Sequence, residues 1–168
     1  MTYPLYTASV PVFTQMLNGL KTVLTKAAAH AAAKNIDPSA LLLARLSPDM
    51  FTLTRQVQVA CDFAKGPACR LAGQEPPAHA DTETSFDGLI ARIDAVQAIL
   101  AGLNAVQFET AATREIVTQA GTPREKRFTG NDYLFTYGLP HFFFHVVTAY
   151  DIVRHNGVEL SKKDYIAA

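Results

Sequence analysis

The sequence has no excess charge of either sign and no long apolar run, and each absence excludes a class of protein. Basic and acidic residues number 15 each in 168 residues, so no positive surface for a nucleic-acid backbone is expected. No apolar run approaches the roughly 20 residues of a membrane-spanning helix, and the N-terminus lacks the features of a signal peptide. We therefore expect a cytoplasmic protein that binds neither nucleic acid nor a membrane.

Cysteines and catalytic motifs are also scarce. Cys61 and Cys69 lie eight residues apart in one predicted helix. This spacing separates them by about 12 Å along the axis, beyond the Cα separation of about 7 Å that a disulfide allows. We expect both to be buried thiols. The sequence contains no G-x-S-x-G, C-x-x-C or H-E-x-x-H motif and no phosphate-binding glycine loop, so it does not support the standard hydrolase, redox or kinase interpretations.

The sequence contains enough apolar residues to form the core of one helical domain. Hydrophobic residues make up 49% of the chain and charged residues 18%, which predicts a single packed domain over residues 1–168. Apolar residues recur at spacings of three and four along four long segments. The predicted helices run from Ser9 to Lys34, from Ser47-Pro48 to about Gly73, from Ser85 to Leu103, and from Asn131 to His155.

Capping and turn residues refine these boundaries. Ser9 is the expected N-cap of the first helix because Pro11 follows it, and Asp37-Pro38 predicts a short connecting helix from Ser39 to Arg45. Gly66-Pro67 and the segment 138–140 should kink or interrupt their helices. The polar stretch 74–84 should be an exposed connection with a solvated His79, and the runs 114–118 and 125–129 predict a small hairpin.

Two histidines on the last predicted helix are the main candidates for chemistry. His141 and His145 lie four residues apart, so a helix presents both on one face, one turn above the other. Neutral imidazoles with this spacing can share a zinc ion or a similar divalent ion. The same spacing is also typical of histidines that pack in a helix seam and bond to protein groups.

The last helix resembles that of the DinB-like superfamily of four-helix bundles, many of which bind metal. The superfamily pattern, H-x-x-x-H-R-G-Q followed by a Tyr, a Leu-Arg pair and Gly-Val, has counterparts in His141, His145, Arg154, Gly157 and Val158. The R-G-Q triplet is replaced here by V-V-T. Segments 139–158 and 45–51 resemble an uncharacterised bacterial family within this superfamily. The resemblance implies an all-α, up-down-down-up four-helix bundle, to which the short connecting helix and the hairpin would be added.

The resemblance also implies a metal site that lacks one of its usual ligands. DinB-like sites draw a third histidine from the second long helix, and this sequence has none there. Asp49 could supply a carboxylate oxygen to a zinc or nickel ion held by the two histidines, whereas Gln56 is a poor zinc ligand. Asp49 could equally stabilise the helix dipole in a first turn, without any metal.

Gln56 could line a pocket beside this site. Three residues near the end of the last helix, Tyr150, Arg154 and His155, could either organise that helix end or form an edge of the pocket. Arg154 could bind an anionic ligand there. His155 lies ten residues beyond His145, about 15 Å along the axis, so these two histidines cannot share one ion.

Two functional interpretations follow from these features. The first, which we expect, is a non-catalytic bundle that forms a homodimer through an apolar helix face and binds a small ligand or a partner. It predicts that the histidines are bonded to protein groups. The alternative is a metal-dependent enzyme in which His141 and His145 hold an ion that activates water or a thiol. For that case the resemblance implies thiol-dependent transfer or isomerisation ahead of hydrolysis.

Overall fold

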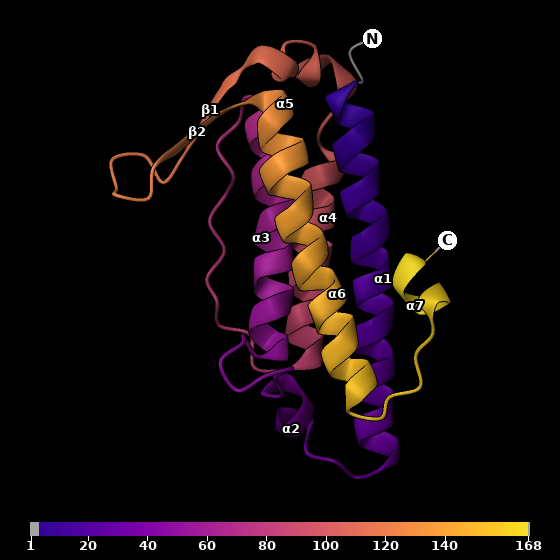
Figure 1. The fold of residues 1–168 in the computed structure, drawn as a ribbon. Helices are drawn as coiled ribbons and strands as arrows, with labels where there is room; N and C mark the ends of the chain where they lie inside the picture. Colours follow the sequence, from indigo (N-terminus) through magenta and orange to yellow (C-terminus); the bar gives the residue numbers. More distant parts are fainter. Residues whose placement is uncertain (1–3, 168) are drawn as a thin grey trace.

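Four long helices lie side by side around one apolar core (Figure 1) within residues 4–167, the part of the chain that this computed structural model describes. They are α1 (Leu5–Ala33), α3 (Leu53–Leu71), α4 (Phe86–Ala101) and α6 (Leu139–His155). The shorter elements are α2 (Pro38–Leu42), η1 (Ala105–Phe108), η2 (Ala111–Thr113), β1 (Glu115–Thr118), β2 (Lys126–Thr129), α5 (Gly130–Asp132), η3 (Tyr133–Gly138) and α7 (Lys162–Ile166). The prediction of a mainly helical fold is confirmed.

Contacts between side chains fix the relative directions of the helices. α1 and α4 are antiparallel, and so are α3 and α6. The connection from residue 74 to residue 84 runs back along the length of α3 (Figure 1), so α4 starts at the same end of the bundle as α3. Between α1 and α4, Lys21 contacts Asp94 and Asn18 contacts Gln97. Gln56 contacts His145, and Arg70 contacts Tyr133 just before α6, which fixes the direction of α3 relative to α6. Lys65 contacts His79 and Arg55 contacts Asp81, which fixes the direction of the connection along α3.

The first helix begins earlier than the sequence indicated. α1 starts at Leu5 and continues through Pro11, so Ser9 is not its N-cap. Ser9 is buried instead, and its hydroxyl donates to the carbonyl of Leu5 at 2.5 Å. Burial of Leu5 and Val10 in the core stabilises this extra turn, and packing therefore outweighs the boundary signal of the proline.

The start of α3 also differs from its prediction. α3 begins at Leu53, where the hydroxyl of Thr52 accepts from the backbone N–H of Arg55, and not at Ser47-Pro48. The segment around Ser47 forms a turn, in which the Met50 N–H donates to the Ser47 carbonyl at 2.9 Å. Asp49 therefore lies outside the helix, and its predicted place in a first helical turn is wrong.

Several local predictions are confirmed. Asp37 caps α2 by accepting from the N–H of Ser39, and β1 and β2 form an antiparallel hairpin with Ile116 opposite Phe128. Gly157 follows α6 with a φ of 88°, as expected of a residue just beyond a helix end. Cys61 and Cys69 are free and buried. In the described part of the chain, no single helix is long and apolar enough to cross a membrane.

Candidate functional site

The histidine pair lies where α6 packs against α3. His145 is 7% exposed, and its Nδ1 lies 2.7 Å from Oε1 of Gln56. The amide nitrogen of Gln56 donates to the Phe51 carbonyl, so the amide oxygen faces the imidazole and Nδ1 is the donor. Burial lowers the pKa of His145 to about 4, and neighbouring His141 and Arg55 act in the same direction. His145 is therefore a neutral imidazole with Nε2 as its acceptor nitrogen.

His141 is exposed and lies in an aromatic stack. Its ring is parallel to that of Phe63, with centroids 4.5 Å apart, and Tyr137 meets it edge-on at the same distance. Partial burial, followed by the charge of Lys126, lowers the pKa of His141. Both histidines are thus held in the form that can bind a metal ion or accept a hydrogen bond.

A third ligand for a metal ion is missing from this pair. Asp49 is exposed, and it accepts from the hydroxyl of Ser47 at 2.7 Å, which lowers the pKa of its carboxyl. Within residues 4–167, no group of three or more His, Cys, Asp or Glu residues could hold a metal ion. Gln56 orients His145 through a hydrogen bond. The donor set is therefore two imidazoles, which fit a structural metal site incompletely.

The other predicted pocket residues lie at the far end of α6. Tyr150 packs edge-on against Tyr165 of α7, with centroids 5.9 Å apart. Arg154 is exposed and donates to the carbonyl of Val158 at 3.5 Å, and His155 is exposed in the last turn. These contacts close the helix end and hold the C-terminal segment. The structure brings Gln56 to His145, but Tyr150 and Arg154 contact α7 and the helix end instead.

A cleft opens beside the histidine pair, on the other side of Phe63 and Tyr137. It has a volume of about 370 Å³ and lies between α3, the connection 74–84, the hairpin and η3. α3 continues through Pro67, which was expected to kink or interrupt it, although Pro67 has no N–H for the Phe63 carbonyl. On another wall of the cleft, η3 is π-helical. Gly138 allows these walls to meet, since a Cβ there would lie 3.1 Å from Pro67.

Polar groups line one side of this cleft. Lys65 is 5% exposed, and its ammonium lies 3.3 Å from Asp62 and 3.4 Å from Nδ1 of His79. Arg70 donates to the hydroxyl of Tyr133 at 3.2 Å. Burial comes first in lowering the pKa of His79, with Lys65 next, so His79 is neutral and its Nδ1 accepts from the ammonium.

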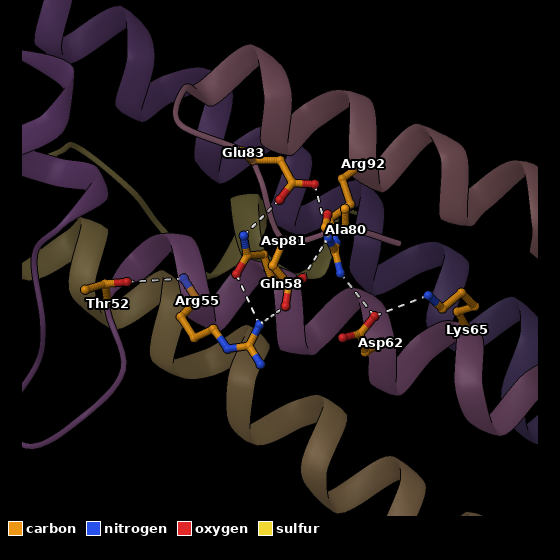
Figure 2. Close-up of polar contacts among 9 residues, drawn as sticks. All are labelled: Thr52, Arg55, Gln58, Asp62, Lys65, Ala80, Asp81, Glu83 and Arg92. Carbon is orange, nitrogen blue, oxygen red and sulfur yellow. Dashed lines mark hydrogen bonds and ion pairs between the residues drawn. The ribbon is translucent and has the colours of Figure 1, made fainter. Parts of the chain in front are cut away.

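The connection that forms one wall is held by a buried arginine (Figure 2). Arg92 of α4 bonds to Asp62, Asp81 and Glu83, with its side chain 2% exposed. Its Nε is buried without a hydrogen-bond partner among the described residues. Figure 2 also shows Arg55 reaching Asp81 and Lys65 reaching Asp62, so both ends of the network start from α3. These pairs fix residues 80–83 against the bundle.

Sequence reasoning did not assign Lys65, Arg70 or His79 to a site. His79 was expected to be solvated but is half-buried against Lys65. The sequence did contain an indication that Lys65 is buried. It lies four residues after Cys61 and next to Ala64, both on the apolar stripe of the helix. A charged residue that close to a buried stripe needs partners, and in this chain the 74–84 connection supplies one of them.

Known proteins share this fold. The structure is similar to the crystal structure of a DinB family member protein from Shewanella denitrificans, with a TM-score of 0.91 and 43% sequence identity, over 98% of this chain and 92% of that chain. The fold is therefore that of a DinB-like helical protein. A family model described as Domain of unknown function (DUF1993) matches residues 5–166, and the chain belongs to this family. A comparison with curated proteins finds no match.

Proposed function

We propose that this domain is a small-ligand-binding four-helix bundle of the DinB-like, up-down-down-up type. The topology is supported by the antiparallel pairs α1 with α4 and α3 with α6, and by the connection 74–84 that runs the length of α3. The ligand site is the cleft between α3, this connection and η3.

The observation that carries the proposal is the construction of the cleft. Its volume of about 370 Å³ is in the range of small-molecule sites, and aromatic rings and polar side chains line it together. π-helical segments are frequent at functional sites because they redirect side chains out of the regular helical pattern. Here η3 places Tyr133 and Tyr137 on the cleft.

A steric block in the cleft tests this proposal. Ala78 lines the cleft and is exposed, so Ala78→Trp should fill its opening without disturbing the core. A screen of small molecules by ¹H–¹⁵N NMR should find ligands that perturb amides around Gly66 and Gln119, and Ala78→Trp should abolish their binding. Ala80→Trp, an exposed position of the same connection outside the cleft lining, is the matched control. Ligands that perturb no cleft amide would contradict the proposal.

A metal-dependent enzyme is the second candidate, and the tautomer of His145 favours it. Metal-bound histidines commonly donate their second ring nitrogen to a protein oxygen, as Nδ1 of His145 does to Gln56. His141 and His145 would hold a zinc or nickel ion, with solvent or substrate completing the coordination. Elemental mass spectrometry of untagged protein should then find stoichiometric metal that His145→Ala removes and His155→Ala retains. Absence of metal in all three proteins, even after incubation with excess zinc and nickel, would contradict this candidate.

We also propose that the domain forms a homodimer in the cytoplasm. Large apolar side chains are exposed on both sides of His145: Phe51 is 49% exposed and Phe144 54% exposed, with Val147 one turn further at 39%. Such a surface is typical of an interface. Two free cysteines agree with a reducing compartment. Sedimentation analysis should show a dimer that Phe144→Glu dissociates, and a monomeric wild-type protein would contradict the assembly.

A further inference from the structure

We propose that the cleft beside Phe63 binds a small organic anion, whose carboxylate or phosphate group lies against Lys65 and Arg70 and whose apolar body lies against the aromatic wall. This inference rests on the proposed ligand-binding function and names its ligand class. It rests on the charges that line the cleft, on the geometry around Gly66 and on the aromatic and apolar residues of the lining.

The charge balance of the cleft is positive. The charged groups that line it are Lys65, Arg70 and Asp62, while His79 is neutral. Asp62 is shared, because Arg92 donates to the same oxygen at 3.1 Å that lies 3.3 Å from Lys65. Arg92 also pairs with Asp81 and Glu83, so Asp62 remains to balance Lys65. The guanidinium of Arg70 is therefore the positive excess of the lining. The cleft keeps a positive excess that a ligand anion would neutralise.

Arg70 supplies the second cation. Among the residues that the structure describes, no carboxylate forms an ion pair with its guanidinium, and its contact in the cleft is the hydroxyl of Tyr133 at 3.2 Å. Gly66 makes this position possible, because a Cβ at that residue would lie 2.8 Å from Nη1 of Arg70. The absence of a side chain at Gly66 lets the guanidinium lie close to α3 at this position. A planar guanidinium with free donors suits both carboxylate and phosphate groups.

The rest of the lining favours an organic ligand over a bare inorganic ion. Phe63 and Tyr137 are only partly buried and present aromatic surface, and three residues of the connection, Pro76 to Ala78, also line the cleft. Lys65 with only 5% exposure would attract an anion in a partly desolvated setting, where a charge-assisted hydrogen bond is stronger than in water.

The test compares anionic and neutral ligands of the same size by NMR titration at constant ionic strength. The probes are benzoate, phenyl phosphate and benzyl alcohol, and the reporters are the backbone amides of Gly66, Ala78 and Gln119. We expect the anions to perturb these amides and to bind at least about tenfold more tightly than benzyl alcohol. The tighter of the two anions identifies the head group, carboxylate or phosphate.

Variants test whether the anion binds at this site or is attracted only by the overall charge of the protein. Lys65→Met and Arg70→Gln should each weaken anion binding at least about tenfold, whereas Lys34→Met, at an exposed position after α1, should leave it unchanged. Gly66→Ala should weaken it as well by displacing Arg70, and it removes no charge from the protein. Thermal unfolding followed by circular dichroism shows that each variant is folded, and Gly66→Ala keeps the test decisive if Lys65→Met does not fold.

Two results would overturn the inference, and they are distinguishable from each other. If benzyl alcohol binds in the cleft as tightly as the anions, the cleft is a ligand site but not an anion site. If none of the probes, and no member of a wider screen, perturbs the cleft amides, the proposed ligand-binding function fails together with this inference.

Discussion

Gln56 and His145 join α3 to α6 through a single buried hydrogen bond, with Nδ1 of the imidazole 2.7 Å from the amide oxygen. Gln56 is 1% exposed and His145 7%, so water does not replace a lost partner easily. Gln56→Leu should therefore lower the free energy of unfolding by about 1–3 kcal/mol, because it leaves a buried donor without a partner. Urea denaturation measures the change.

The double variant gives the control for that bond. If the penalty arises from the unpaired imidazole, replacing both Gln56 and His145 by Leu should cost less than the sum of the two single substitutions. Additive penalties would show that the two side chains do not depend on each other.

Stability should fall in mildly acidic solution because of His145. Its pKa is about 4 in the folded protein and about 6.5 in an unfolded chain, so the unfolded state binds more protons between these values. The contribution of neutral His145 to the free energy of unfolding is complete above pH 6.5. It is lost as the pH falls toward 4, by up to about 3 kcal/mol. Urea unfolding at pH 7 and at pH 4.5 should show this loss, and His145→Gln should reduce it. An identical pH dependence in the variant would contradict the assignment.

Gly66→Ala should separate stability from binding. Gly66 lies inside α3 and does not have a positive φ, so alanine should stabilise the helix by up to about 1 kcal/mol. The new Cβ displaces the flexible end of Arg70 rather than backbone. Thermal unfolding should show an unchanged or higher Tm. A markedly lower Tm would show that the guanidinium cannot move away.

Gly19→Ala should release the C-terminal helix. A Cβ at Gly19 would overlap the carbonyl of Tyr165 in α7, and backbone cannot move aside as a flexible side chain can. Hydrogen–deuterium exchange should accelerate in residues 162–166 while the core of α1 stays protected. Lys26→Met, which removes only the ion pair with Asp164 at 2.7 Å, should have a smaller effect. Unchanged exchange in α7 after the glycine substitution would contradict this packing.

Arg92→Met should loosen the connection between α3 and α4. The buried guanidinium pairs with Asp62, Asp81 and Glu83, and its loss should cost about 1.5–3 kcal/mol. Limited proteolysis should then cleave within residues 74–84 more readily than in the wild type. Lys21→Met breaks an exposed pair with Asp94 and should change stability by less than about 1 kcal/mol. Equal effects of the two variants would contradict the role of Arg92.

The boundaries of the helices show how far local sequence signals reach. Asp37 caps α2 as predicted, and α4 begins beside Ser85, where the third long helix was expected to start. Each of these caps is a hydrogen bond between neighbours in the chain. The signals at Ser9 and Ser47 failed for the opposite reason. Whether a helix continues past a proline or starts late depends on what its next turn can bury, and that is decided by the other helices.

The candidate site was likewise only partly predictable from the sequence. Helical spacing placed His141 and His145 on one face of α6, and the resemblance placed the chain among DinB-like folds, a relation that the comparison structure supports. The partners of these histidines come from α3, 89 residues away in the case of Gln56. Periodicity describes one helix at a time, so it could not show that Gln56 binds His145 while Asp49 turns to Ser47.

By itself, the sequence determined the helical class, the cap of α2, the hairpin and the shared face of the two histidines, all of which depend on residues close together in the chain. Only the tertiary structure decided that Lys65, Arg70 and Tyr133 meet in one cleft. That convergence depends on a proline within α3, a π-helical segment before α6 and a connection held by Arg92. These elements are distant in sequence, and packing alone brings them together.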